Sequence, residues 1–254
     1  MDLSDARTFE LFHEVYGTLP RAGPGGDEHT VQALESVPGA TPRTVLDLGC
    51  GPGAQTESLA RALPMAQILA VDLLPAMVEE ANRRFTDLGI RDRVHARVGD
   101  MAEPPVAPGS QDLIWCEGAI YFLGITNALR IWQPLLGAAG TVAFTEPIWL
   151  VDSPPEEVRE WWVSEYPGIT DDGGIQSQIE AASYRVIASF PLPASAWWDE
   201  YYEPMLTRIE DLRSRFPDDP RAIEVVTVAE TEIDKFRRFS DCYSYAFYIV
   251  QPTE

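Results

Sequence analysis

Lysine is almost absent from this chain of 254 residues, in which Lys235 is the only one. Nineteen basic residues stand against forty Asp and Glu residues, so the formal net charge is -21. Such a field repels phosphate backbones and anionic headgroups, and we expect neither nucleic acid nor a membrane surface as a partner. The acidity serves solubility or attracts a cationic substrate.

Cysteine and long apolar runs are also scarce. Cys50, Cys116 and Cys242 are odd in number and widely spaced, unlike a disulfide framework or a metal-binding pair. We therefore expect reduced thiols and no metal site. No segment approaches the roughly twenty apolar residues that span a bilayer, and residues 1–5 lack the basic and apolar regions of a secretion signal. These absences predict a cytoplasmic protein.

The hydrophobic fraction of 45% predicts a chain that folds along its whole length. From residue 44, short apolar runs alternate with amphipathic segments, which is typical of βαβ units around a parallel sheet. We expect strands at 45–48, 68–71, 94–98, 113–116, 141–145, 184–190 and 243–250. Helices are expected at 7–19, from 27 to 37, and at 55–63, 75–88, 127–136, 175–182 and within 195–239.

The most informative segment is 45–53, an apolar strand that opens into a glycine turn before a helix. Gly49, Gly51 and Gly53 let the backbone turn sharply and approach a ligand, while the helix presents free N–H groups. Gly49, Gly51 and Ala54 also satisfy the dinucleotide fingerprint, so NAD is a rival ligand by pattern alone.

Two further features favour an adenosyl sulfonium over NAD. Asp47 immediately precedes the glycines, where a carboxylate would repel a pyrophosphate but suits a cationic ligand. Asp100 and Met101 follow the third strand, where they can contact the edge and the face of an adenine. Asp72, at the end of the second strand, suits the ribose of either cofactor.

The segments 45–53, 70–72, 98–101, 112–115 and 140–142 together resemble, in order and spacing, the motifs of class I S-adenosylmethionine-dependent methyltransferases. The chain is most similar to the group that includes ubiquinone and menaquinone biosynthetic enzymes. Segments 21–25, 115–121 and 162–167 resemble a small bacterial subgroup of these enzymes that brings no substrate assignment. Pro52 departs from the commonest turn, in which Thr or Ser stands at this position.

The resemblance implies an α/β fold: a Rossmann-like seven-stranded, mostly parallel sheet flanked by helices, with the last strand antiparallel. We expect an N-terminal helical lid over residues 1–39 and the methyltransferase domain over 40–254. Cap insertions are expected at about 147–175 and 195–239.

The resemblance also implies S-adenosylmethionine as cofactor and S-adenosylhomocysteine as product. Asp47 and the glycine turn would hold the methionine end, Asp72 the ribose, and Asp100 with Met101 the adenine. The full set of expected cofactor-binding residues is Arg21, Asp47, Gly49, Cys50, Gly51, Gly53, Asp72, Leu73, Gly99, Asp100, Met101 and Glu117.

Methyl transfer requires a closed chamber, an aligned acceptor atom and, for some acceptors, a base. Candidate catalytic residues are Glu117, Tyr121 and His13, and the expected substrate-binding residues are Tyr16, Tyr121, Glu146, Trp149 and Tyr166. Glu117 can equally be a surface carboxylate, His13 a half-buried helix residue, and Arg21 a solvated loop cation.

The function predicted from the sequence is methyl transfer to a small molecule at oxygen, nitrogen or carbon, by a monomer or homodimer. One alternative is a protein that binds S-adenosylmethionine for sensing without turnover. A lesser alternative is an NAD-dependent oxidoreductase.

Overall fold

The computed structural model describes residues 1–2 and 4–253, and a single mixed sheet organises them. Its strand order is β3-β2-β1-β4-β5-β8-β7, with the short β6 paired to β5. The strands are β1 (Thr44–Leu48), β2 (Gln67–Asp72), β3 (Val94–Val98), β4 (Gln111–Cys116), β5 (Leu136–Trp149), β6 (Thr170–Asp171), β7 (Tyr184–Pro191) and β8 (Tyr243–Pro252). Only β8 runs against its neighbours. The predicted Rossmann-like sheet with its last strand antiparallel is confirmed, and β6 is an added eighth strand.

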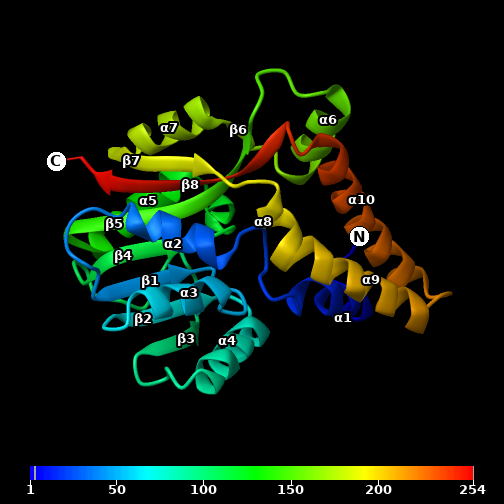
Figure 1. Ribbon diagram of the computed structural model, residues 1–254, viewed down its shortest axis with the longest axis horizontal. Helices are drawn as coiled ribbons and strands as arrows, with labels where there is room; N and C mark the ends of the chain where they lie inside the picture. Colours follow the sequence, from blue (N-terminus) through cyan, green and yellow to red (C-terminus); the bar gives the residue numbers. More distant parts are fainter. Residues whose placement is uncertain (3, 254) are drawn as a thin grey trace.

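Helices cover both faces of the sheet (Figure 1). On one face, α2 (Asp27–Glu35), α3 (Ala54–Ala62) and α4 (Pro75–Asp87) contribute Ala33, Leu59 and Phe85 to one buried cluster. On the other face, α5 (Ile125–Trp132) and α7 (Asp172–Ala181) contribute Leu129 and Ile179 to a second cluster. The central strands are apolar on both sides because each face packs against helices.

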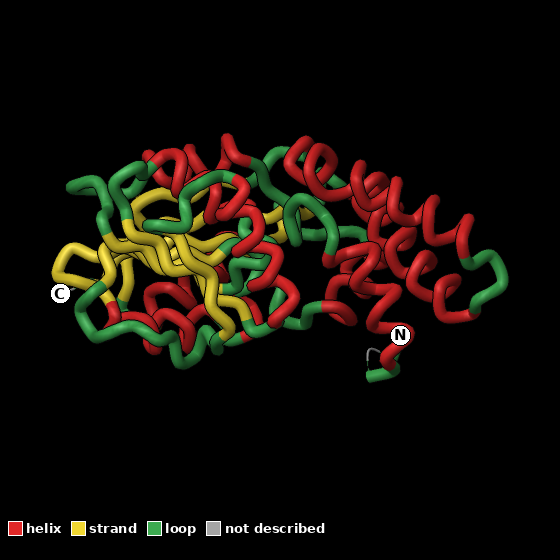
Figure 2. The backbone as a smooth tube through the Cα atoms, turned by 90° about the horizontal axis from the view of Figure 1, so that it is seen from below, coloured by secondary structure: helices red, strands yellow, loops and turns green. Residues whose placement is uncertain are grey.

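A third buried cluster lies in a helical cap at one end of the sheet, which Figure 2 shows beside the strands. The cap consists of α1 (Ala6–Phe12), the π-helical η1 (His13–Gly17), α6 (Glu156–Glu165), α8 (Ser195–Trp197), the π-helical η4 (Trp198–Tyr202), α9 (Glu203–Arg215) and α10 (Pro220–Phe239). Leu11, Trp162, Trp197 and Phe236 are among its buried residues. The N-terminal segment thus contributes to both parts of the molecule, α1 to the cap and α2 to the sheet. The domain boundaries that we drew from the sequence stay a prediction.

The strand predicted at 141–145 is longer in the structure. β5 extends from Leu136 to Trp149 and stays paired with β8 as far as Tyr243. Because β4 ends at Cys116, opposite Phe144, β5 loses one flanking strand before it reaches Pro147, where a residue without an amide hydrogen is tolerated. The inserted segment therefore begins after Trp149 rather than at Pro147.

The predicted helix 127–136 is also shorter than expected. It ends at Trp132, and residues Gln133–Leu135, which include Pro134, form the 3₁₀ turn η3 before β5 begins at Leu136. A second 3₁₀ turn, η2 (Ile120–Phe122), follows β4. Thus η2 lies between β4 and α5, and η3 lies between α5 and β5.

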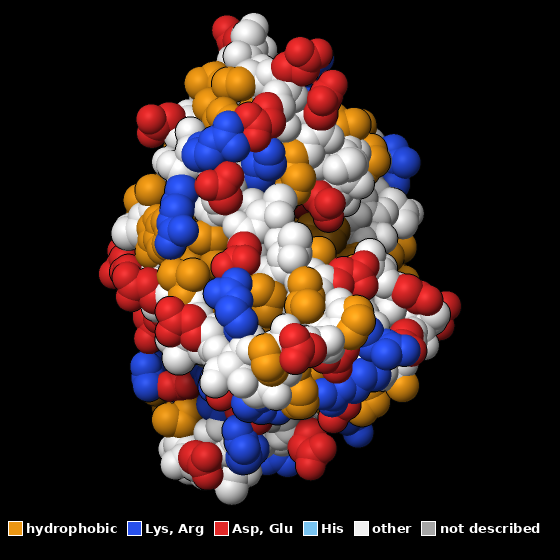
Figure 3. All heavy atoms as spheres, turned by 90° about the vertical axis from the view of Figure 1, so that its right-hand side faces the viewer, with side chains coloured by type: hydrophobic (Ala, Val, Ile, Leu, Met, Phe, Trp, Pro, Cys, Tyr) orange, Lys and Arg blue, Asp and Glu red, His pale blue; other side chains and the backbone are white. Residues whose placement is uncertain are grey.

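The exposed surface of the cap is mixed in charge. Figure 3 shows acidic and basic side chains intermingled on this end of the molecule. Ion pairs such as Arg213–Glu230 and Arg215–Glu14 account for part of this mixture. Within the described residues, no helix combines the length and the apolar character needed to cross a membrane.

Candidate active site

The turn between β1 and α3 requires glycine for two different reasons. Gly49 has φ 72°, and a Cβ added there would collide with the Ala119 methyl. Gly53 has φ 86°, and its Cβ would lie 3.0 Å from atoms of Ala81 and Phe85 on α4. Gly49 therefore allows the loop after β4 to approach the turn, whereas Gly53 allows the turn to pack on α4.

A cavity of about 440 Å³ opens beyond the carboxyl ends of β1 to β4. Open α/β sheets bind their ligands in this position. Of the expected cofactor-binding residues, the cavity is lined by Arg21, Gly49, Cys50, Gly51, Asp72, Leu73, Gly99, Asp100, Met101 and Glu117. Asp47 and Gly53 are not among the lining residues. The structure thus brings together ten residues that the sequence places on five different segments.

Asp72 connects the end of β2 to the glycine turn. Its Oδ2 accepts a hydrogen bond from the Gly51 N–H at 2.9 Å, and its Oδ1 accepts one from the Leu74 N–H at 2.9 Å. Each oxygen keeps a further lone pair. The carboxylate is therefore held in place at the cavity wall with capacity to accept ligand hydroxyls.

Asp100 and Met101 form the neighbouring part of the wall. The Asp100 Oδ1 accepts from the Ala102 N–H at 2.8 Å, which folds the loop after β3 into a tight turn. The Met101 carbonyl accepts from the Trp132 Nε1–H at 2.8 Å, so this loop is tied to α5. Asp100 is thus held through its side chain and Met101 through its backbone, and both residues line the cavity.

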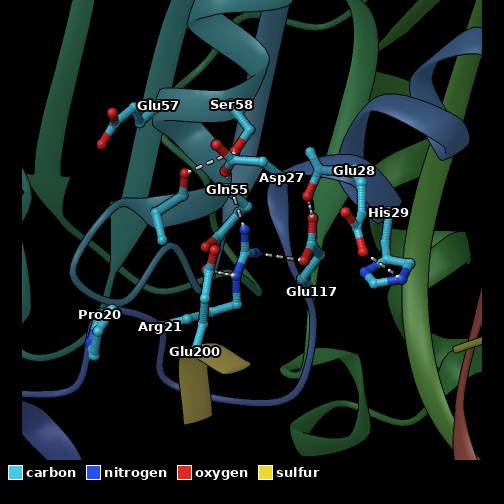
Figure 4. Close-up of polar contacts among 12 residues, drawn as sticks. Pro20, Arg21, Asp27, Glu28, His29, Gln55, Glu57, Ser58, Glu117 and Glu200 are labelled. Carbon is cyan, nitrogen blue, oxygen red and sulfur yellow. Dashed lines mark hydrogen bonds and ion pairs between the residues drawn. The ribbon is translucent and has the colours of Figure 1, made fainter. Parts of the chain in front are cut away.

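Arg21 is a buried cation at the cavity edge, only 3% exposed. Figure 4 shows its guanidinium between Glu117, Glu200 and Asp27. Nη1 donates to the Glu117 Oε2 at 2.9 Å and Nε donates to the Glu200 Oε2 at 3.2 Å. Nη2 lies 3.7 Å from the Asp27 Oδ1, and it has no hydrogen-bond partner among the described residues. Arg21 is therefore no solvated loop cation but a buried one, which three carboxylates surround.

Glu117 is held on both carboxylate oxygens. Besides the bond to Arg21, its Oε1 accepts from the Thr30 Oγ1–H and from the Trp115 Nε1–H, both at 2.8 Å. Its side chain is 7% exposed. Glu117 is therefore no surface carboxylate; it is a fixed negative charge on the cavity wall that also locks the loop carrying Arg21.

Asp47 lies behind the glycine turn. It is fully buried, its Oδ2 accepts from the Thr56 Oγ1–H at 2.5 Å, and its Oδ1 has no partner among the described residues. Burial raises the pKa of Asp47 to about 7. Its assignment to the methionine end of a cofactor stays a prediction.

A second cavity, of about 280 Å³, adjoins the first and shares Ala22, Gly23, Pro24, Gly118 and Tyr121 with it. The other lining residues come from β5, β8 and the cap: Pro147, Trp161, Trp162, Glu165, Tyr166, Trp197, Tyr201, Glu232 and Tyr245. The loop of residues 22–24 and the segment after β4 thus form a common wall between two chambers.

Of the expected substrate-binding residues, Tyr121 and Tyr166 line the second cavity, with ring centroids 5.7 Å apart. The other three do not line it but lie behind it. The Tyr16 hydroxyl lies 3.2 Å from the Glu232 Oε2, and Trp149 packs edge-on against Tyr243. Their contact with a substrate stays a prediction.

Glu146 is the fifth of these residues and is completely buried. Its Oε1 accepts from the Tyr166 hydroxyl at 2.5 Å, and its Oε2 has no partner among the described residues. Burial raises the pKa of Glu146 to about 7. Glu146 thus reaches the second cavity through Tyr166.

The candidate bases differ in position. His13 belongs to η1, stacks on Phe9 with a centroid distance of 6.4 Å, and lines neither cavity. Tyr121 lines both cavities, and burial raises its pKa to about 12. Tyr121 therefore stays protonated near neutral pH and serves as a hydrogen-bond donor rather than as a base.

Sequence reasoning missed Glu232 and Gln55 as lining residues. Glu232 accepts hydrogen bonds from Tyr16, Tyr201 and Tyr202. It lies three residues after Ala229 and four before Phe236, both buried, so a carboxylate on the apolar face of α10 was a detectable signal. Gln55 donates to the Cys50 carbonyl at 3.1 Å, a contact for which the sequence carries no signal.

Comparison with known proteins adds a family match: residues 45–138 match the family model of a methyltransferase domain. Malonyl-[acyl-carrier protein] O-methyltransferase of Legionella pneumophila is 40% identical over 41% of this chain and 36% of its own length. Trans-aconitate 2-methyltransferase of Rhodococcus jostii is 32% identical over 68% of this chain and 66% of its own. The chain thus spans about a third of one relative and 66% of the other.

Solved structures share the fold over nearly the whole chain. A methyltransferase from Geobacter sulfurreducens in complex with S-adenosyl-L-homocysteine has a TM-score of 0.82 at 20% identity, covering 97% of this chain and 98% of that one. The corresponding complex from Thiobacillus denitrificans has a TM-score of 0.81 at 20% identity, with 100% of both chains covered. These likenesses concern the fold.

Proposed function

Since the chain belongs to the class I S-adenosylmethionine-dependent methyltransferases, with its family match on residues 45–138, we propose that it methylates a small molecule. The larger cavity would hold S-adenosylmethionine and the smaller one the acceptor, and S-adenosylhomocysteine would be the product. The observation that carries this proposal is the pair of adjoining cavities, which share a wall at Tyr121 and the loop of residues 22–24.

The donor set of the larger cavity fits this cofactor. Asp72, Asp100 and Glu117 place three carboxylates around it, which suits a ligand that bears a sulfonium and an ammonium. Among the described residues that line the cavity, Arg21 is the one basic side chain, and its guanidinium at the cavity edge suits a ligand carboxylate. A pyrophosphate would meet three like charges, which disfavours the NAD alternative.

Each wall residue has a role in this proposal. Asp72 would accept hydrogen bonds from the ribose, and the loop of Asp100 and Met101 would contact the adenine. Arg21 would bind the carboxylate of the methionine end, and Glu117 would both orient the ammonium and keep Arg21 in place. Cys50, Gly51 and Leu73 would contact the cofactor through the backbone.

The bound cofactor supplies a methyl group that is already activated for displacement from sulfur. The protein's contribution is then alignment of the acceptor and exclusion of water. Tyr121, at the junction of the cavities, would donate a hydrogen bond that positions the acceptor. Tyr166 and Glu146 would form the route by which an acceptor proton leaves, because Glu146 is a carboxylate with a pKa near neutrality.

The test is a pair of measurements. A thermal-shift comparison should show stabilisation by S-adenosylhomocysteine and none by NAD. Incubation with S-adenosylmethionine and a metabolite extract should convert the cofactor to S-adenosylhomocysteine. Binding without conversion would favour the sensing alternative, and stabilisation by NAD alone would contradict the proposal.

The state of the cysteines bears on the cellular compartment. Cys50, Cys116 and Cys242 are free thiols, which supports a reducing compartment such as the cytoplasm. A free small molecule as acceptor agrees with the volume of the second cavity, about 280 Å³, and with the aromatic residues in its lining.

A further inference from the structure

The smaller cavity has an unbalanced charge. Its lining contains two carboxylates, Glu165 at the exposed rim and Glu232 in the interior, and no Lys, Arg or His among the described residues. An acceptor that bears a carboxylate or a phosphate would meet like charge here and find no basic side chain. The lining therefore selects against anionic acceptors.

Both carboxylate oxygens of Glu232 accept hydrogen bonds, but no basic side chain pairs with them among the described residues. Its Oε1 accepts from the Tyr201 and Tyr202 hydroxyls at 3.0 and 3.3 Å, and its Oε2 accepts from the Tyr16 hydroxyl at 3.2 Å. These donors are neutral. No ion pair to Glu232 occurs within the described part of the chain, and Glu165 adds charge of the same sign. Burial raises the pKa of Glu232, and a cation in the cavity would favour the charged form of this carboxyl group.

Most of the remaining side chains in the lining are aromatic: Tyr121, Trp161, Trp162, Tyr166, Trp197, Tyr201 and Tyr245. Aromatic faces attract an ammonium through their quadrupole, and the attraction grows when water is excluded. Trp162 is 8% exposed and packs edge-on against Tyr243, with ring centroids 5.1 Å apart, so its ring is held in place at this wall.

We propose that the smaller cavity binds a small organic ammonium, and that the methyl acceptor is an amine. This inference rests on the proposed methyltransferase function. A protonated amine first loses one proton by the route through Tyr166 and Glu146 proposed above. The nitrogen lone pair then forms the new C–N bond, while the C–S bond of the cofactor breaks and its electron pair stays on sulfur.

Three probes of nearly identical shape test the charge preference: choline, its neutral carbon isostere 3,3-dimethylbutan-1-ol, and the anion 3,3-dimethylbutanoate. Their affinities are measured by NMR titration of the full chain at saturating S-adenosylhomocysteine. We expect choline to bind at least ten-fold more tightly than the neutral isostere, and the anion to bind more weakly still. Equal affinity for choline and the isostere would overturn the inference.

Two variants localise the site. Glu232→Gln should weaken choline at least ten-fold and Glu165→Gln about three-fold, with little change for the neutral isostere. Glu160→Gln, which removes an exposed carboxylate from the same helix as Glu165, is the matched control and should change neither. Since Glu165 is exposed, its variant keeps the test decisive if Glu232→Gln does not fold. Choline binding that neither variant weakens would place the ligand elsewhere and overturn the inference.

The same titrations separate this inference from the function on which it rests. If S-adenosylhomocysteine binds and choline shows no preference, the amine proposal fails while the methyltransferase proposal stands. If S-adenosylhomocysteine does not bind to the wild-type protein, the proposed function itself fails.

Discussion

Arg21 and Glu117, 96 residues apart in the chain, form a buried ion pair of 2.9 Å at the wall of the larger cavity. The pair joins the loop that follows the N-terminal helical segment to the loop that follows β4. Because both loops also line the smaller cavity, through residues 22–24 and through Gly118 and Tyr121, this contact fixes the wall between the two chambers.

Replacing Arg21 should weaken both the fold and the ligand site. Arg21→Ala leaves Glu117 as a buried carboxylate without its cation, and we expect a loss of about 3 kcal/mol in the free energy of unfolding. Affinity for S-adenosylhomocysteine should fall at least ten-fold in calorimetry. Arg213→Ala breaks an exposed pair with Glu230, and as control it should cost less than about 1 kcal/mol. Unchanged affinity in Arg21→Ala would refute its contact with the cofactor.

Asp72→Ala should weaken S-adenosylhomocysteine binding by about 1 to 3 kcal/mol, because it removes the expected ribose acceptor. The variant also leaves the Gly51 and Leu74 N–H groups without their partner. Asp72→Asn retains one of the acceptor oxygens. Its affinity for S-adenosylhomocysteine in calorimetry should therefore lie between those of Asp72→Ala and the wild type. Equal affinities for all three proteins would contradict the assigned pocket.

Gly49→Ala should abolish cofactor binding, because the added methyl collides with Ala119 at a backbone φ of 72° that L-residues rarely adopt. The measurement is the thermal shift on addition of S-adenosylhomocysteine. Gly173→Ala is the control, since its Cβ would meet only the Asp171 carboxylate at 3.5 Å. A normal ligand-induced shift in Gly49→Ala would count against the close approach of the two loops.

Glu146 makes the stability of the fold depend on pH. Its folded-state pKa of about 7 lies above the ordinary value of 4.5, so folding favours the protonated carboxyl. Its stabilising effect is complete below pH 4.5 and is lost as the pH rises to about 7. A shift of this size corresponds to a change on the order of 3 kcal/mol.

Urea unfolding of wild type and Glu146→Gln at pH 5.5 and pH 8 checks this account. The variant cannot ionise, so its stability relative to wild type should be greater at pH 8 than at pH 5.5. Asp47 acts in the same direction in both proteins and cancels in the comparison. A stability difference that is independent of pH would show that Glu146 does not titrate in this range.

The sequence predicted the sheet, and it singled out residues that the structure places around the larger cavity, because both kinds of signal are local. The turn of Gly49 and Gly51 and the carboxylate of Asp72 each stand directly after an apolar strand, and a parallel sheet brings such strand ends to one edge. The sequence did not predict that Asp47 is fully buried and lines no part of the larger cavity, because a position at a strand end does not tell which way a side chain faces.

The smaller cavity could not be predicted in the same way. Its central carboxylate, Glu232, meets Tyr16 from 216 residues away and Tyr201 from the preceding helical segment. Such contacts depend on how the cap helices pack, and no local spacing encodes them. The aromatic residues of the cap were recognisable as a group, but the carboxylates among them were not.

A crystal structure of the protein with S-adenosyl-L-homocysteine tests the central claim most directly. We expect adenosine density beside Asp72, Asp100 and Met101, with the amino-acid end at Arg21 and the sulfur facing the wall at Tyr121. Density at any other place, or a larger cavity closed by side chains at saturating ligand, would contradict the account.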